Sequence, residues 1–217
     1  KHLAYLNDPN KEGAEPLILE HRSLIHVNLR GYDLRGAVFT DCDFGYVSFR
    51  DVIASDAVFI DCNFLAAEFN RTNLKGCQFQ DCNLIRAKFT QTNLSFVDFY
   101  TSDLNLVRFY QGTEFKDAHF QRANLTNIAS YTTFFHLGSD PRGYTIWAYA
   151  DENNVLNIHA GCRHFVGIDR AYDHWRYAHD DRPYIQAHFL GVLAALEVMA
   201  PPRGVLLNPP VDNNQIP

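Results

Sequence analysis

The chain has 217 residues, of which 47% are hydrophobic, and a net charge of −6. Basic and acidic residues number three and four in residues 1–23, ten and twelve in 24–129, and six and nine in 130–217. This balance argues against a basic nucleic-acid-binding face. No apolar stretch reaches the ~18–20 residues that span a bilayer. We therefore expect a cytoplasmic protein that contacts neither membrane nor nucleic acid directly.

A five-residue period follows a lead-in of residues 1–23. A large apolar residue, Leu or Phe, falls at every fifth position from Leu24 to Phe109, with Ala54 as the interruption. From Val27 onward, a smaller residue stands two positions before each of them, Tyr32 excepted, and the residue in between is mostly Asn or Asp. Alternate residues of an extended segment point the same way, so the small and large residues face inward and the polar one outward. The other two residues of each five suit a corner.

Four such sides close a square, so residues 20 apart stack in columns. The hexapeptides FTDCDF, FIDCNF and FQDCNL, at 39–44, 59–64 and 79–84, are the same side of three successive coils. They predict an inward aromatic column, an inward cysteine column and an acidic corner column. These columns are Phe39, Phe59, Phe79 and Phe99; Cys42, Cys62 and Cys82; and Asp41, Asp61 and Asp81. Five cysteines, an odd number with four at inward positions, favour free thiols in a reducing compartment.

The period predicts an all-β solenoid of about five coils between Leu24 and Leu125. A step of six residues from Phe109 to Phe115 predicts a bulge near Gly112. The segments LRGYDLRGAVFTDCDF and FNRTNLKGCQFQDCNLIRAKFTQTNLSFVDF resemble the pentapeptide-repeat family over residues 24–129. The resemblance implies a right-handed quadrilateral β-helix. Some members of this family protect type II topoisomerases, so the resemblance also implies, as an alternative, a DNA mimic that occupies the DNA-binding face of gyrase. The short rod and its near-neutral charge depart from that pattern.

Residues 130–217 have a different character. Two strand-like segments, 143–150 and 155–162, flank turn-forming residues and predict a β-hairpin. Asp169 suits the N-cap of a helix over RAYDHWRYAH. An apolar stripe over residues 183–200 predicts a second helix, buried against the end of the solenoid or against a second copy in a homodimer. We expect an α+β module with an extended tail. Its NIHAGCRHF and DHW segments are similar to a small module of uncharacterised bacterial and phage proteins.

The densest polar cluster lies in this module. Its candidate site residues are Cys162, Arg163, His174 and Trp175. His159, Cys162, His164 and His174 are residue types that bind zinc, but their spacing matches no known template, so we predict no metal and no other cofactor. A Cys162–His174 pair assisted by Asp173 would need contact between thiolate and imidazole. No flanking signature accompanies it, so we predict no catalytic residues and keep a cysteine-dependent enzyme as an alternative.

Apolar side chains at outward positions mark a candidate contact surface on the solenoid. They are Ile25, Leu65 and Ile85, which should align as a vertical patch. Either the C-terminal helices fold back onto this patch or a partner binds it. The leading interpretation is a non-enzymatic scaffold or regulator that binds a protein partner. The contact is made by the solenoid faces, including the column of Asp41, Asp61 and Asp81, or by the C-terminal module, which otherwise serves as a cap.

Overall fold

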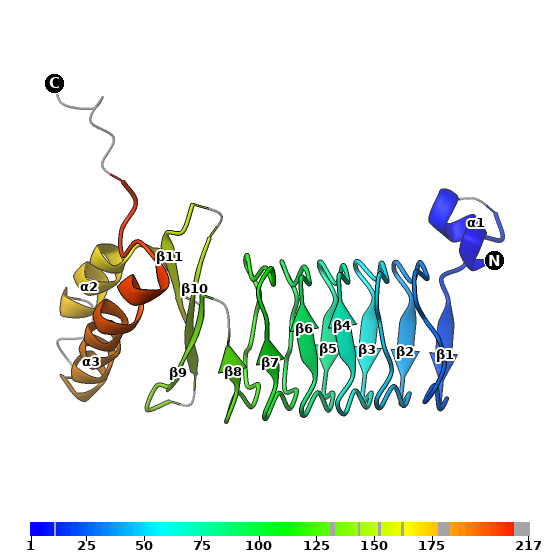
Figure 1. The fold of residues 1–217 in the computed structure, drawn as a ribbon, viewed down its shortest axis with the longest axis horizontal. Helices are drawn as coiled ribbons and strands as arrows, with labels where there is room; N and C mark the ends of the chain where they lie inside the picture. Colours follow the sequence, from blue (N-terminus) through cyan, green and yellow to red (C-terminus); the bar gives the residue numbers. More distant parts are fainter. Residues whose placement is uncertain are drawn as a thin grey trace, which may run out of the picture. The chain divides into compact units, whose positions relative to one another are not determined.

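The computed structural model describes residues 1–10, 12–130, 133–142, 144–151, 153–161, 163–177 and 183–210. The chain divides into two compact units, Lys1–Thr132 and Thr133–Pro217 (Figure 1). Each unit has its own core.

The first unit is a parallel β-solenoid of about six turns (Figure 1). One side is a sheet of β1 (Ile18–Glu20), β2 (Val38–Thr40), β3 (Val58–Ile60) and β5 (Gln78–Gln80). A second side is a sheet of β4 (Glu68–Asn70), β6 (Lys88–Thr90), β7 (Arg108–Phe109) and β8 (Ala129–Ser130). The other two sides are ladders of single bridges, which run from Asp33 to Glu114 and from Ser23 to Asn124. The predicted four-sided solenoid is confirmed.

The first coil begins earlier than the five-residue pattern. β1 pairs in parallel with β2, so the ladder starts at Ile18, not at residue 24. A short helix, α1 (His2–Asn7), precedes it. The His2 ring ties α1 to this coil: its Nδ1 accepts from the Leu17 N–H at 2.9 Å, and its Nε2 donates to the Asp33 carbonyl at 3.2 Å.

Stacked phenylalanines fill the solenoid. Phe39, Phe59 and Phe79 occupy matching positions on paired strands, with ring centroids 5.1 and 4.9 Å apart. The column continues through Phe99 to Phe120 at 5.1 Å per step. Offset stacking at this spacing adds attraction to the burial of the rings. The predicted aromatic column is therefore the core of the unit.

The inward cysteines are buried free thiols that join the backbone network. They are Cys42, Cys62, Cys77 and Cys82. The Cys62 thiol donates to the Phe39 carbonyl at 3.5 Å, 23 residues earlier, and the Thr72 hydroxyl makes the equivalent bond to Phe49 at 2.7 Å. Burial raises the pKa of the Cys77 thiol. The inward cysteines therefore serve packing, which agrees with the Ala, Val and Thr residues at the equivalent inward positions of other sides.

The corners of the square use left-handed backbone. Asp41, Asp61 and Asp81 have φ of 50°, 52° and 53°. The N–H of Asp41 bonds to the Ile60 carbonyl of the next coil at 2.9 Å. Asp adopts this conformation more readily than most other non-glycine residues, so it suits this position. The predicted bulge is present: Gly112 has φ of 81°, and the pairing offset grows from 20 to 21 residues, as in Asn93 with Glu114.

The second unit packs two helices on one face of an antiparallel sheet of order β12-β11-β10-β9. Its elements are β9 (Phe134–Ser139), β10 (Thr145–Ala150), β11 (Leu156–Ala160), β12 (Arg163–Val166), α2 (Ile168–Tyr177), α3 (Pro183–Met199) and the 3-10 turn η1 (Pro201–Arg203). The predicted hairpin is β10 with β11, and both predicted helices are present. The two flanking strands, β9 and β12, were not predicted.

Two expectations for this unit were wrong. Asp169 is not an N-cap, because α2 already begins at Ile168, and the Asn208 side chain accepts from the Asp169 N–H at 3.0 Å. The tail is not simply extended: Leu206 forms a parallel bridge with Val155, and Val205 is buried in the core. The segment up to residue 210 is thus part of the fold, and residues 211–217 lie outside the described part.

Candidate functional site

The predicted apolar column of Ile25, Leu65 and Ile85 offers little exposed surface. Ile25 is 36% exposed, whereas Leu65 and Ile85 are half-buried. Gly45 occupies the same column between Ile25 and Leu65 and is buried. The residues do stack, because the N–H of Tyr46 bonds to the Leu65 carbonyl and that of Ala66 to the Ile85 carbonyl. The column is therefore a narrow stripe with one prominent apolar side chain.

The acidic corner is exposed along its length. Asp41, Asp61 and Asp81 are all exposed. His21 Nδ1 lies 2.7 Å from Asp41 Oδ2, and the Thr101 hydroxyl donates to Asp81 Oδ1 at 2.5 Å. Part of this corner borders a shallow depression that includes His21, Asp41 and Asp61. The acidic corner spans three coils, and Asp41 and Asp81 at its two ends already have side-chain partners.

The described candidate residues of the second unit lie in different environments. Trp175 is 1% exposed, and its ring stacks on Phe189 at 4.2 Å in the core of the unit. Arg163 is exposed at the start of β12. His174 is half-buried with its ring 5.2 Å from Phe165. Cys162 lies outside the described residues, so the Cys162–His174 pair is not described.

The histidines considered for zinc face opposite sides of the sheet. His159 and His164 are neighbours on β11 and β12, with ring centroids 4.2 Å apart. His174 instead contacts Phe165, which packs against the helix-covered core. In the described part of the chain, no group of three or more His, Cys, Asp or Glu residues is placed to hold a metal ion. None of the described helices is long and apolar enough to cross a membrane.

A basic corner of the solenoid was missed by the sequence analysis. Arg30, Arg50 and Arg71, from three successive coils, surround the single carboxylate of Asp51. The nitrogen–oxygen distances are 3.3, 3.5 and 2.6 Å, in the same order. Partial desolvation works to raise the pKa of Asp51, but the hydrogen bond from Arg71 and the charges of all three arginines lower it overall. Counting charged residues along the columns of the stacked coils, and not over long regions of the sequence, would have revealed this corner.

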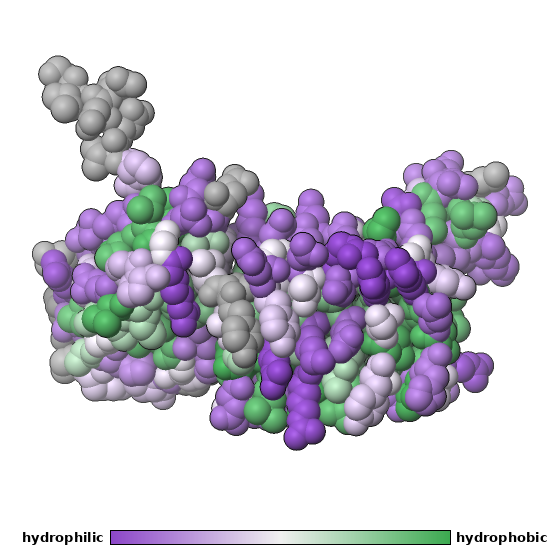
Figure 2. Space-filling model, viewed as in Figure 1, coloured by the Kyte–Doolittle hydropathy of each residue, from purple (hydrophilic) through white to green (hydrophobic). Residues whose placement is uncertain are grey.

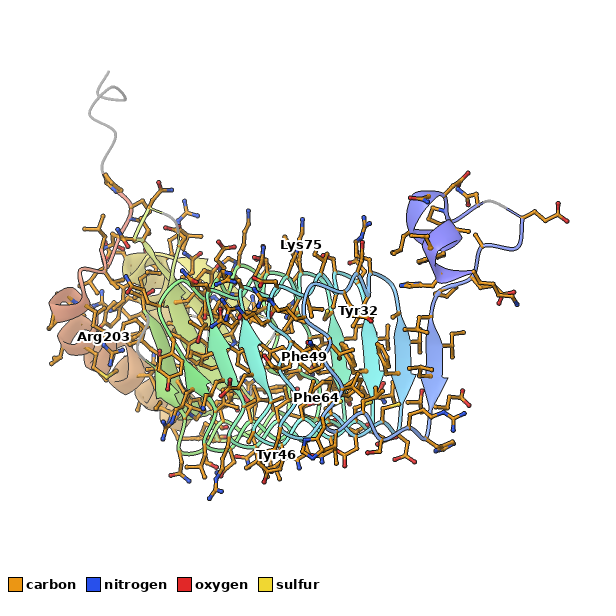
Figure 3. The ribbon with its side chains drawn as sticks, turned by 45° about the vertical axis from the view of Figure 1, so that its right-hand side comes forward. Tyr32, Tyr46, Phe49, Phe64, Lys75 and Arg203 are labelled. Carbon is orange, nitrogen blue, oxygen red and sulfur yellow. The ribbon has the colours of Figure 1, made fainter. Side chains whose placement is uncertain are left out.

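Two large apolar side chains are exposed beside the basic corner. Tyr32 is 57% exposed and Ile53 is 42% exposed. Their backbones are adjacent, because the Ile53 N–H bonds to the Tyr32 carbonyl at 3.1 Å. Tyr32 occupies an inward position of the first coil, yet it lies on the surface toward the N-terminal end of the solenoid (Figure 3).

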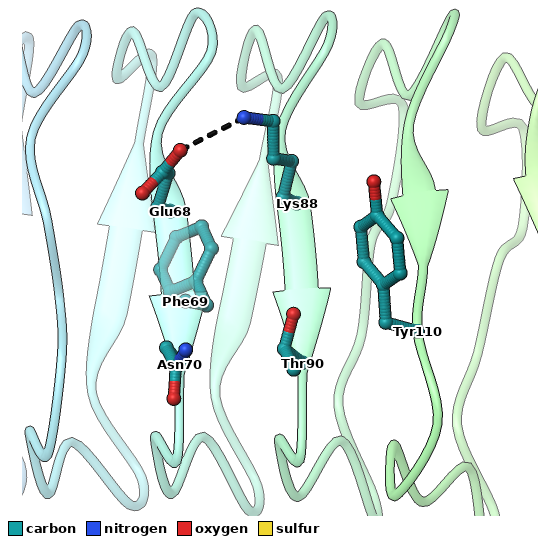
Figure 4. A pocket seen from close by; sticks show the side chains of 6 residues that line it. All are labelled: Glu68, Phe69, Asn70, Lys88, Thr90 and Tyr110. Atoms are coloured by element: carbon teal, nitrogen blue, oxygen red, sulfur yellow. Dashed lines mark hydrogen bonds and ion pairs between the residues drawn. The ribbon is translucent and has the colours of Figure 1, made fainter.

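A shallow pocket lies on the adjoining side of the solenoid (Figure 4). It is lined by Glu68, Phe69, Asn70, Lys88, Thr90 and Tyr110. Lys88 Nζ and Glu68 Oε1 form an ion pair at 2.8 Å across its rim. The Asn70 Oδ1 atom is buried and has no hydrogen-bond partner within the described residues. The pocket adjoins the basic corner, since the Asp51 N–H bonds to the Asn70 carbonyl.

Comparison with known proteins finds a family model that matches the solenoid. A family model described as a pentapeptide repeat region matches residues 32–109 and 52–134. Among solved structures, a pentapeptide repeat protein from the Arabidopsis thaliana thylakoid lumen is 24% identical, with a TM-score of 0.39. The match covers 46% of this chain and 66% of that chain. The chain matches no curated protein sequence.

Two further solved structures are similar at lower identity. HetL, a pentapeptide repeat protein involved in heterocyst differentiation regulation in the cyanobacterium Nostoc sp. strain PCC 7120, is 14% identical with a TM-score of 0.21. That match covers 60% of this chain and 93% of HetL. QnrB1, a plasmid-mediated fluoroquinolone resistance protein, is 20% identical with a TM-score of 0.20, over 59% and 88% of the two chains.

Proposed function

Residues 32–134 are a pentapeptide-repeat region, and from this premise we propose that the protein is a non-enzymatic scaffold or regulator that binds a protein partner through its solenoid. The observation that carries the proposal is that two exposed large apolar residues of the first coils, Tyr32 and Ile53, lie side by side. In all, six large apolar residues are exposed on several sides of these coils. They are Ile18, Ile25, Val27, Tyr32, Tyr46 and Ile53. Figure 2 shows hydrophobic residues gathered at the β1–β3 end of the solenoid among hydrophilic ones. Exposed apolar side chains that adjoin one another, as Tyr32 and Ile53 do, are typical of contact sites.

The solenoid suits this function because its surface is rigid. Each outward side chain is held by backbone bonds to the coils on either side, as for the Asp43 N–H with Arg22 and the Asn63 N–H with Cys42, both at 2.8–2.9 Å. A partner therefore meets a surface that loses little conformational freedom on binding.

Affinity capture with full-length variants tests this proposal. The variant Tyr32→Ser/Tyr46→Ser/Ile53→Ser removes exposed apolar area from the first coils. The matched control, Phe96→Ser/Leu106→Ser, removes side chains that are 47% and 38% exposed on later coils. We expect wild type and control to retain one saturable partner that the triple variant loses. Retention of the same partner by all three proteins would contradict the proposal.

Homodimerisation through residues 183–200 is a second candidate. The inner stripe of α3, including Ile185, Phe189 and Leu193, is buried within its own unit, so only outer side chains remain for a dimer. Of these, Tyr184 is 61% exposed and Val198 is 73% exposed. Sedimentation equilibrium of wild type and of Val198→Glu tests it: a dimer that the substitution dissociates supports the candidate, and a monomer at all concentrations excludes it.

The DNA-mimic alternative has weaker support. The acidic corner of Asp41, Asp61 and Asp81 spans three coils, and a basic corner of three arginines lies on the same solenoid. DNA presents negative charge continuously along both strands.

A cytoplasmic location also stays a proposal, with the four buried free thiols as its support.

A further inference from the structure

Two opposite corners of the first coils differ in charge. The column of Asp41 and Asp61 is separated by ten residues, half a coil, from the column of Asp51 and Arg71, so the two lie on diagonal corners. On the second corner, Arg30, Arg50 and Arg71 gather around Asp51, which leaves a net charge of about +2 there. The near-neutral total for residues 24–129 hides this separation.

The arginines of the basic corner have donor capacity to spare. A guanidinium carries five N–H donors, whereas the single Asp51 carboxylate has about four acceptor sites. The side chains of Arg30, Arg50 and Arg71 remain 59%, 45% and 45% exposed. Ion pairs this exposed contribute little to stability, so the guanidinium groups turn toward another carboxylate at small cost.

The coils hold these arginines in two neighbouring columns, with Arg30 and Arg50 in one and Arg71 in the column of Asp51. The Gly31 N–H bonds to the Arg50 carbonyl at 3.1 Å, and the Asp51 N–H bonds to the Asn70 carbonyl at 3.0 Å. Successive coils are therefore separated by the ~4.8 Å of neighbouring strands. Planar guanidinium groups held on a rigid stack of coils are suited to bidentate recognition of carboxylates.

Apolar anchors adjoin the basic corner and favour a protein as the occupant. Tyr32 and Ile53 are both exposed and lie side by side on the first two coils. Interfaces between proteins are enriched in Tyr and Arg, and the residues that dominate binding are most often of these types. A surface that recognised a polyanion by charge alone would have no use for Ile53.

We infer that Arg30, Arg50 and Arg71, together with Tyr32 and Ile53, form the docking surface for an acidic protein segment with apolar side chains. The inference rests on the proposed protein-binding function and specifies the chemistry of the partner. Complementary charge speeds encounter and excludes basic partners, and the apolar pair holds the segment once it has docked. Because the charges are exposed, binding weakens as salt rises.

Fluorescence anisotropy with a defined peptide tests the inference on the full-length chain. The probe is a labelled octapeptide of six Glu and two Leu residues, and the comparison peptide has Gln in place of Glu. We expect saturable binding of the acidic peptide at 20 mM salt, at least tenfold weaker at 300 mM salt, and no binding of the Gln peptide. Absence of binding at 20 mM salt would overturn the inference.

Matched variants locate the binding site. Arg50→Glu/Arg71→Glu should abolish binding of the acidic peptide. Arg86→Glu/Arg122→Glu should leave this binding unchanged, because these two arginines, with φ of 62° and 58°, stand at other corners of the solenoid. Arg50→Lys/Arg71→Lys keeps the positive charges but removes the planar guanidinium groups, so it should weaken peptide binding several-fold. This variant also provides the test if the Glu variant fails to fold. Equal loss in the control pair would overturn the inference.

The apolar pair separates a protein-docking surface from a general anion surface. Tyr32→Ser/Ile53→Ser should weaken the acidic peptide several-fold and leave heparin binding unchanged. Heparin or a DNA oligonucleotide that binds more tightly than the peptide, with no dependence on Tyr32 and Ile53, would overturn the inference. If Arg50→Glu/Arg71→Glu still retained a natural partner in affinity capture, the inference would be overturned and the proposed function would stand. If the wild-type protein captured no partner, that result would count against the proposed function.

Discussion

Phe64 shows how a single residue contributes to the solenoid. Its ring stacks on Phe44 at 4.9 Å and meets Phe59 and Phe79 edge-on at 5.1 and 5.4 Å. It is fully buried, so each neighbour depends on it for packing on one side (Figure 3). Outward residues such as Phe96 lack this enclosure. The direction in which a side chain points therefore decides whether it serves stability or contact.

Removal of the Phe64 ring should be costly. We expect Phe64→Ala to lower the free energy of unfolding by about 3–5 kcal/mol, because the ring is lost and the stacked columns leave a cavity that cannot collapse. Urea unfolding followed by far-UV circular dichroism measures this loss. Phe96→Ala is the control, since that ring is 47% exposed, and its effect should stay within about 0.5 kcal/mol. Equal effects would show that the columns are not the core.

The acidic corner should accept Asn but not Val. Asp61 has φ of 52°, a conformation that β-branched residues adopt at a cost of about 1–2 kcal/mol. We therefore expect Asp61→Val to lower the midpoint of thermal unfolding, and Asp61→Asn to leave it nearly unchanged. A decrease for Asn as large as that for Val would mean that the carboxylate, not the backbone, is what the corner requires.

At the scale of elements, polar ladders and turns hold the apolar columns in register. Asn63 donates to Asp43 Oδ1 at 2.8 Å, accepts from the Asn83 side chain at 3.0 Å, and accepts from the Leu65 N–H at 3.1 Å. In the second unit, Asp140 performs a similar task in the β9–β10 turn. Its carboxylate accepts from the N–H groups of Arg142 and Tyr144 at 2.8 and 3.0 Å.

Loss of one ladder residue should affect three coils. We expect Asn63→Ala to cost about 1–2 kcal/mol, because it removes two side-chain bonds between coils and leaves the half-buried Leu65 N–H without its acceptor. Chemical unfolding provides the value. Asn28→Ala is the comparison: among the described residues it removes only the bond from the Arg30 N–H on the exposed first coil, so it should cost less. An equal cost would imply that the bonds between coils contribute nothing.

Asp140 should make the second unit sensitive to acid. Burial works to raise the pKa of this carboxyl, but the Arg142 guanidinium and the two backbone N–H groups lower it overall. A lowered pKa means that the stabilisation is complete above the ordinary Asp pKa of about 3.9 and is lost as pH falls through the native value.

The comparison of Asp140→Asn with wild type tests this linkage. We expect a loss of about 1–3 kcal/mol at pH 7 and a smaller difference near pH 3. Both tryptophans, Trp147 and Trp175, lie in the second unit, so tryptophan fluorescence reports on its unfolding specifically. A difference that stayed constant between pH 7 and pH 3 would show that the charge of Asp140 plays no part.

On the scale of the whole molecule, the two units carry separate probes. The tryptophans report on the second unit, and the buried thiols Cys42, Cys62, Cys77 and Cys82 report on the solenoid. The thiols span coils that share one stacked core, so the solenoid should open as a cooperative block over that length. Burial, which raises the pKa of the Cys77 thiol, also keeps it from reacting as a thiolate.

Thiol labelling measures this cooperativity. In a Cys162→Ser background, we expect no reaction with a disulfide reagent in the native state and reaction of all four thiols in a single transition as urea rises. The midpoint should coincide with that of far-UV circular dichroism. Early labelling of Cys42 alone would instead show that the N-terminal coils open before the rest, as nearest-neighbour stability allows in repeat proteins.

Much of the solenoid was predictable because its rule is local. Alternation along five residues decides which side chains point inward, and strict repetition then places Phe39 over Phe59 and Cys62 over Cys82 without any knowledge of distant contacts. The hairpin and the helix over residues 183–199 carried similar local signals. The strands β9 and β12 carried none that stood out from their surroundings.

The sequence by itself determined the period, the square coil and its inward columns, since each depends on the order of neighbouring residues. Only the tertiary structure decided that Trp175 belongs to a core and that Asn208 caps α2 from 39 residues away. It likewise decided that three arginines converge on Asp51, and that Tyr32 is exposed although its position in the repeat is inward. These outcomes depend on side chains meeting across coils and across elements, and the coils and elements must be stacked before those contacts exist.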